Sequence, residues 1–100
     1  MDESLAAGPD FFTWSDLRIV LIGESTSDGW VLARGWRRND ELSDVRRWSF
    51  SSERRFVGQV RRLVRDATDD QRLADHVAQL ASLWIGAHGR DTPAAPAADR

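Results

Sequence analysis

The 100-residue chain contains no cysteine, no lysine and no tyrosine. Without cysteine it can form no disulfide, no thiolate nucleophile and no cysteine-ligated metal site. Because lysine is missing, all 14 basic residues are arginine. Together with the alanine-rich C-terminus, this bias is typical of a protein from a GC-rich bacterial genome. The use of arginine in place of lysine therefore says little about guanidinium chemistry.

Long apolar runs are also absent. The longest strongly aliphatic stretch runs only from Ile19 to Ile22, whereas a helix needs about 20 apolar residues to cross a bilayer. The N-terminus carries Asp2 and Glu3 in place of a basic region, so we predict no secretory signal. We expect a small cytoplasmic bacterial protein that does not engage a membrane.

Large apolar side chains are nevertheless plentiful, with hydrophobic residues at 41% and five tryptophans and four phenylalanines. This supply suits one modest core, and the length allows one domain. We expect the domain to span residues 11–88. Residues 1–10 are predicted to be a flexible lead-in, and residues 89–100 a disordered Ala/Pro tail.

The net charge of −2 hides an uneven distribution. Residues 1–28 carry one arginine against six acids (−5), residues 29–65 ten against four (+6), and residues 66–100 three against six (−3). The basic middle could attract an anionic partner, or the acidic flanks could neutralise it within the molecule. The sequence leaves both alternatives open.

Three strands are expected from β-branched and alternating residues at 17–24, 30–38 and 45–50. The pair Asp28-Gly29 predicts a turn between the first two, and Gly35 marks a candidate bulge. Residues 39–44 are expected to form a polar loop, with a short helical turn as the alternative. The aromatic group at 11–14 is predicted to pack into the core, although an exposed partner-binding patch would also fit it.

Two helices are expected after the strands. In residues 51–67 an apolar stripe lies opposite an arginine stripe at helical spacing, with Ser51 or Ser52 as the N-cap. The second helix, residues 69–85, is predicted to begin with a capping box formed by Thr68 and Gln71. A connection of about two residues predicts that the helices pack together. The predicted core consists of Trp48, Phe50, Phe56, Val60, Leu63, Leu73, Val77, Leu80 and Trp84.

The sequence therefore predicts an α+β fold, a three-stranded antiparallel sheet followed by two packed helices. The order of three strands and a serine-capped helix is similar in outline to the arm-binding domains of phage-type integrases and to plant AP2-type domains. That resemblance covers residues 17–66 and implies that the sheet would read the DNA major groove. The acidic residues at 39–44 and the negative net charge depart from it.

Catalytic chemistry has little support in the sequence. His76 and His88 are twelve residues apart, too far along one helix to act together as metal ligands. The carboxylates at 40, 41, 44, 69 and 70 fall in expected loops or caps, where nothing would raise their pKa for acid–base work. We expect no enzymatic activity, no cofactor and no metal.

The arginine stripe of the first helix is the strongest candidate binding feature, with Gly58 in its middle. A second candidate is the alternation of aromatic and arginine at 30–36, a pattern that allows cation–π stacking. The predicted binding residues are Arg54, Arg55, Arg61, Arg62, Arg65, Arg34 and Trp36. We expect a non-catalytic interaction or regulatory module that binds a protein partner or a second copy of itself. The alternative is a nucleic-acid-binding protein that uses the arginine helix and the sheet.

Overall fold

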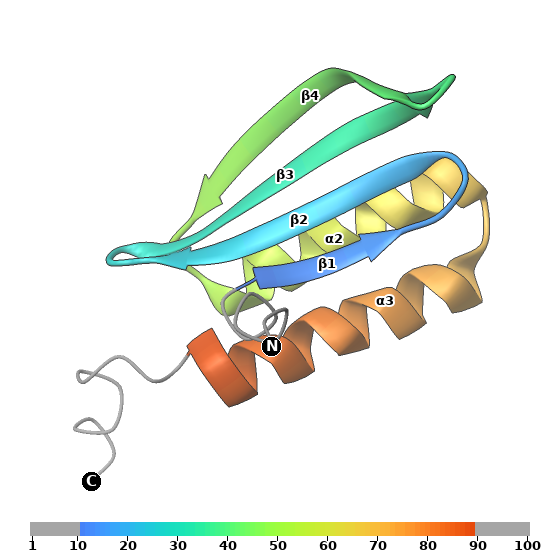
Figure 1. Ribbon diagram of the computed structural model, residues 1–100. Helices are drawn as coiled ribbons and strands as arrows, with labels where there is room; N and C mark the ends of the chain where they lie inside the picture. Colours follow the sequence, from blue (N-terminus) through green and yellow to red (C-terminus); the bar gives the residue numbers. More distant parts are fainter. Residues whose placement is uncertain (1–10, 90–100) are drawn as a thin grey trace, which may run out of the picture.

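The computed structural model describes residues 11–89. Four strands form an antiparallel sheet in the order β1-β2-β3-β4, and two helices follow (Figure 1). The elements are β1 (Phe11–Ser15), β2 (Ile19–Thr26), β3 (Gly29–Arg38), β4 (Glu41–Phe50), α2 (Glu53–Thr68), α3 (Gln71–Trp84) and a short π-helical turn η1 (Ile85–Gly89). The predicted lead-in at 1–10 and most of the predicted tail at 89–100 lie outside the described residues.

The α+β class is confirmed, but the prediction of three strands is wrong by one. The additional strand is β1, which contains the aromatic group Phe11, Phe12 and Trp14 and pairs antiparallel with β2. Its side chains alternate, so Phe12 is buried while Phe11 is exposed. Aromatic residues favour strands, and this short segment alternates too briefly to be distinguished from an irregular packed segment. The core placement predicted for the group therefore holds for only part of it.

The segment 39–44, expected to be a polar loop, is mostly strand. The β3–β4 turn needs only Asn39 and Asp40, whose φ angles are 47° and 70°. Asn and Asp tolerate positive φ, which is what a two-residue hairpin turn requires. β4 therefore begins at Glu41, and it is polar because it is an edge strand with few buried positions.

The predicted irregularity at Gly35 is confirmed. The β3–β4 register shifts between Arg34 and Trp36, so Asp44 and Val45 both lie opposite Gly35. Asp44 adopts a φ of 53° at this point. Such a bulge bends an edge strand and interrupts its outward hydrogen-bonding pattern.

Both helices pack on one face of the sheet, but the N-cap of α3 differs from the prediction. Ser52 caps α2 as expected, since its side chain accepts from the backbone N–H of Arg55. The Thr68–Gln71 capping box does not form, because α2 extends to Thr68 and ends on Asp69 at φ 57°. Asp70 caps α3 instead and accepts from the backbone N–H of Leu73. Two residues, 69 and 70, connect the helices, as the sequence predicts.

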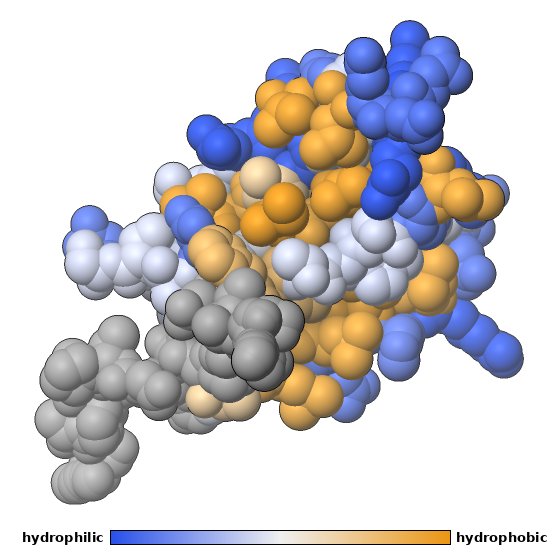
Figure 2. Space-filling view, in the orientation of Figure 1, coloured by the Kyte–Doolittle hydropathy of each residue, from blue (hydrophilic) through white to orange (hydrophobic). Residues whose placement is uncertain are grey.

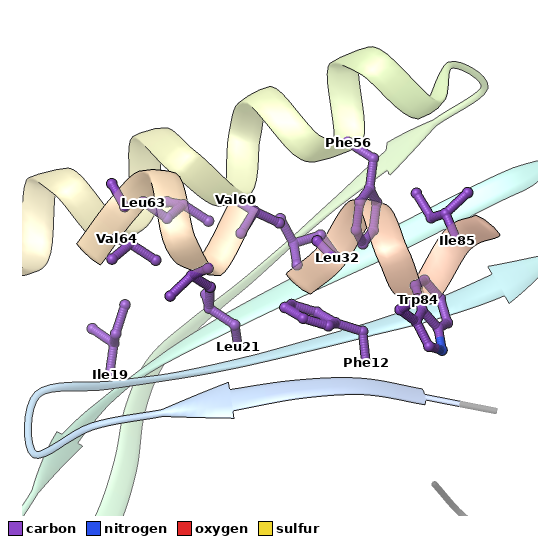
Figure 3. Packing of buried hydrophobic residues seen from close by; sticks show 13 residues of the cluster. Phe12, Ile19, Leu21, Leu32, Phe56, Val60, Leu63, Val64, Trp84 and Ile85 are labelled. Carbon is purple, nitrogen blue, oxygen red and sulfur yellow. The ribbon is translucent and has the colours of Figure 1, made fainter. Parts of the chain in front are cut away.

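The core lies between the sheet and the helices (Figure 3). Phe56, fully buried, lies near the rings of Phe50 and Trp84, with centroid distances of 6.1 and 6.0 Å. The buried apolar residues are Phe12, Ile19, Leu21, Leu32, Phe56, Val60, Leu63, Val64, Ala74, Val77, Ala78, Ala81, Trp84 and Ile85. Trp48, Phe50 and Leu73 are partly buried against them.

The prediction that Leu80 lies in the core is wrong. Leu80 is 37% exposed, and Leu83 at 61% is more so. The buried seam of α3 uses alanines at 74, 78 and 81 with Val77 and Trp84. Small residues let two helices approach closely, so the seam is rotated away from the larger leucines.

Candidate functional site

The face of the sheet away from the helices is uncovered by any described element and is largely apolar. Side chains alternate between the two faces of a strand, and the register places Val20, Ile22, Val31, Ala33 and Val45 together on this side. We call this side of the sheet the outer face. It also carries Phe11 and Leu42. In Figure 1, α2 passes behind β1 and β2 and α3 lies below β1, and Figure 2 shows apolar patches over the sheet.

Several large apolar side chains of the outer face are exposed to solvent. Phe11 is 39% exposed, Ile22 40%, Leu42 50% and Val45 53%. Leu42 and Val45 lie close to Gly35, where an added Cβ would come within 3.4 Å of each. The bulge thus places two apolar side chains of β4 over one glycine. Charged residues border this centre, with Arg47 on β4 and Arg37 on β3 exposed at its margin.

The arginines of α2 do lie on its solvent side, as predicted. Arg54, Arg55, Arg61, Arg62 and Arg65 are all exposed, and we call them the arginine face. Arg61 differs from the others because its Nε donates to Asp75 Oδ1 on α3 at 3.0 Å. Among residues 11–89, the other four have no acidic partner. A Cβ built on Gly58, in the middle of this face, meets no atom within 4 Å.

Arg34 and Trp36, the other predicted binding residues, are placed differently. Arg34 is only 9% exposed, and its guanidinium lies over Trp36 at 4.9 Å and near Trp48 at 5.8 Å. Its Nη2 donates to the carbonyl of Asp44 at 3.3 Å. The aromatic–arginine stacking inferred from the sequence is therefore present, but it fills the helix side of the sheet. Arg34 fixes the bulged part of β4 and offers little guanidinium surface to a partner.

The described histidine and carboxylates form no metal-binding cluster. His76 is exposed on α3, Asp69 ends α2 with its backbone N–H donating to the carbonyl of Arg65, and the carboxylate of Asp70 caps α3. Within residues 11–89 no three side chains of histidine, aspartate or glutamate are close enough to hold a metal ion. A shallow groove beside the start of α2 is lined by Ser52, Glu53, Arg54, Val57, Gly58, Arg61 and Ser82.

The outer face is the feature that sequence reasoning missed. A signal was present, because residues 19–22 are apolar at every position. That pattern is typical of a central strand covered on both sides. In the described part of the chain, helices cover only one side. Sequence alone could not show this, because the number of covering layers is set by the tertiary arrangement.

In the part of the chain that the structure describes, no helix is long and apolar enough to cross a membrane. No known protein family, no curated protein and no solved structure matches this chain.

Proposed function

We propose that this domain is a non-catalytic interaction module that binds a protein partner through the outer face of its sheet. The observation that carries the proposal is the exposure of four large apolar side chains on one sheet face, Phe11, Ile22, Leu42 and Val45. Large contiguous apolar patches on small proteins often mark interaction sites, whereas single exposed apolar side chains are ordinary. An apolar centre with charged residues at its margin is also the usual anatomy of a protein–protein interface.

The size of the outer face sets a limit on this interaction. Four strands about 4.8 Å apart, used over about six residues of about 3.3 Å each, span roughly 400 Å². A standard interface takes about 800 Å² from each partner. A partner on the outer face must therefore also contact an adjoining surface, or it must bind weakly.

The test of self-association is light scattering at increasing protein concentration. We expect Ile22→Thr and Val45→Thr to abolish any self-association of the parent chain, because threonine keeps the strand preference and removes apolar surface. Leu83→Thr is the matched control, since it removes an exposed apolar side chain from α3. Equal loss in the control variant would mean that the self-association is non-specific.

A foreign partner is tested by placing the photo-crosslinking residue benzoylphenylalanine at position 22 or, as the control, at exposed Gln79 on α3. When cells that express these variants are illuminated, the variant with the crosslinking residue at position 22 should give a discrete crosslinked product, and the variant at position 79 should not. A strictly monomeric parent chain, together with the same crosslinking background at both positions, would refute the proposal.

Nucleic-acid binding is the second candidate function, and it rests on the arginine face. Arg54, Arg55, Arg62 and Arg65 have no acidic partner among the described residues, and no described atom covers Gly58 between them. If these arginines contact phosphates, log affinity should fall with log salt by roughly 0.9 per contact on duplex DNA.

Arg62→Ala with Arg65→Ala should reduce that slope by about two contacts and leave the unfolding midpoint nearly unchanged. Arg61 is a poor choice for this test because its removal also breaks the ion pair with Asp75. No binding to duplex or single-stranded DNA or RNA at about 50 mM salt would eliminate this candidate, since electrostatic binding is strong at low salt.

A further inference from the structure

The β4 strand leaves one edge open. It has β3 on one side, and within residues 11–89 no strand lies on the other. Every second backbone N–H and C=O of such an edge points outward and can pair with another strand. The bulge at Asp44 disrupts this pattern in the first half of β4. From Arg46 to Phe50 the pairing with β3 is regular, so this half is the part of the edge that can accept a strand.

The charge along this half is entirely positive. Arg46 lies on the helix side of the sheet and Arg47 on the outer face, because they pair with Arg34 and Ala33 respectively. Both are exposed, and neither has an acidic partner among residues 11–89. The nearest cross-strand charge on the helix side, Arg34, already pairs with Asp44, with Nη2 and Oδ2 3.8 Å apart.

Two arginines of α2 add to the positive charge beneath this edge. Arg61 faces α3, as its ion pair with Asp75 shows. Arg55 and Arg62 are about 100–120° further around the helix and so lie on the flank away from α3. That flank is on the β4 side, because α2 contacts β3 and β4 while α3 contacts β1.

The position along the helix also fits. The start of α2 follows closely on the end of β4, and α2 runs back along the sheet (Figure 1). Arg62 is about 14 Å from the start of α2, and Arg46 is about 13 Å from the end of β4. The two arginines are therefore roughly level.

We propose that residues 46–50 of β4 accept an extended acidic segment of a partner protein as a fifth strand of the sheet. Backbone pairing would supply the hydrogen bonds, as in other cases of strand addition to an open edge. Two adjacent acidic residues in the segment would point to opposite faces, one toward Arg46 and one toward Arg47. This inference rests on the proposed protein-binding function and names the chemistry of the partner.

A second copy of this chain is a poorer occupant of the edge. Its own β4 would bring two more arginines and no acidic residue to the same stretch, so the positive charge along the edge would rise without being neutralised. Nucleic acid fits the charge, but it lacks the regular peptide groups that satisfy an open strand edge.

The probe is a fluorescein-labelled peptide, Thr-Val-Thr-Glu-Glu-Val-Thr-Val, titrated with the full chain at about 50 mM salt and followed by anisotropy. Two control peptides accompany it. One has two lysines in place of the glutamates, and the other keeps the glutamates but has proline in place of the valines at its second and sixth positions. We expect binding of the acidic peptide alone, because proline removes backbone donors. Hydrogen exchange should slow in residues 46–50 when the peptide is bound.

The decisive variant is Arg46→Glu with Arg47→Glu, which should weaken binding by at least about tenfold. Arg54→Glu with Arg65→Glu is the control with the same change in net charge, and it should bind nearly as the parent does. An equal loss in both variants, equal binding of the proline peptide, or protection on α2 in place of β4 would overturn the proposal. So would tighter binding of a single-stranded oligonucleotide that depends on the same two arginines, or the absence of any peptide binding.

These results are separable from the test of the proposed function. Ile22→Thr should leave the peptide affinity unchanged, because Ile22 lies on β2 two strands away. If the peptide fails to bind while crosslinking at position 22 still captures a partner, only the edge proposal is wrong. If the peptide binds, the parent chain is strictly monomeric and position 22 captures nothing, the outer-face proposal is wrong and the edge proposal stands.

Discussion

Two glycines of this chain should respond to the same substitution with opposite signs. Gly23, on the helix side of β2, would place a new Cβ 2.6 Å from Cζ of Phe56 and 3.3 Å from its Cε2. The ring has little room to move away, because it is fully buried and lies near the rings of Phe50 and Trp84. Gly58, on the exposed side of α2, would place its Cβ in open space.

The magnitudes follow from these surroundings. Overpacking a core costs about 1–3 kcal/mol, and the more restricted unfolded chain returns about 0.4–1 kcal/mol. Gly23→Ala should therefore lower the free energy of unfolding by about 0.5–2 kcal/mol. Gly58→Ala should raise it by about 0.5–1 kcal/mol, because glycine is unfavourable inside a helix and nothing opposes the added methyl group.

The assay is thermal and urea unfolding of the parent and both variants. A change of 1 kcal/mol moves the midpoint of a domain of this size by about 4–8 °C, and the urea m-value should stay constant. In a Phe56→Leu background, which removes the outer ring atoms, the Gly23→Ala penalty should shrink. A Gly23→Ala midpoint at or above the parent's would refute the packing argument, and destabilisation by Gly58→Ala would mean that something contacts α2 there.

Three further substitutions test the connections and the core. Asp16→Ala should cost about 1–3 kcal/mol, because Oδ1 accepts from the backbone N–H groups of Arg18 at 2.7 Å and Ile19 at 2.9 Å; Asp16→Asn keeps the acceptor and should melt close to the parent. Gly29→Ala should cost about 1–3 kcal/mol, since φ is 153° and the added Cβ would overlap the carbonyl oxygen of Phe50; a parent-like melt would contradict the turn geometry. Leu63→Asp should abolish the cooperative melt seen by circular dichroism, because a charge would enter a position only 7% exposed; a preserved transition would show that this face of α2 is not the buried one.

The helices could be predicted from sequence because their signals are local. In α2, the stripe of Phe56, Val60 and Leu63 repeats at the helical period, and Ser52 stands directly before it. The connection of two residues follows from the same pattern. The predicted capping box is absent because two candidate N-caps, Thr68 and Asp70, compete within three residues. Thr68 stays in α2, where its hydroxyl donates to the carbonyl of Val64 at 2.7 Å, and Asp70 takes the role of N-cap.

The seam of α3 was mispredicted because size was treated as a guide to burial. Leu80 was predicted as a core residue, but the alanines of α3 are buried in its place. A helical pattern gives the direction of the apolar side only approximately, and a small residue can be buried at a close helix–helix contact. The prediction for the edge strand β4 was too short for a related reason. Its first half carries Glu41 and Asp44, which an edge strand can expose to solvent and a central strand could not.

The candidate surfaces were the least predictable part, because their meaning depends on what covers them. The arginine face follows from helical spacing alone and lies where expected. By contrast, Arg34 was expected at a surface and is enclosed by Trp36 and Trp48. The outer face uses valines and isoleucines that would suit a buried strand equally well. Only the arrangement of the described elements distinguishes a covered sheet face from an open one.

β4 is the element that connects the two proposed protein-binding surfaces. Val45 belongs to the outer face, and Arg46 and Arg47 begin the regular half of the edge directly after it. The outer face alone spans only about half of what each partner contributes to a standard interface. A partner strand added beside residues 46–50 of β4 would widen the sheet by about 4.8 Å and extend its outer side next to Arg47 and Ser49. One protein could therefore use both surfaces, with its acidic strand fixing the register and its apolar side chains covering Ile22 and Val45. The bulge held by Arg34 and Asp44 limits the pairable edge to residues 46–50, which lie beside Val31 and Ala33 of the outer face.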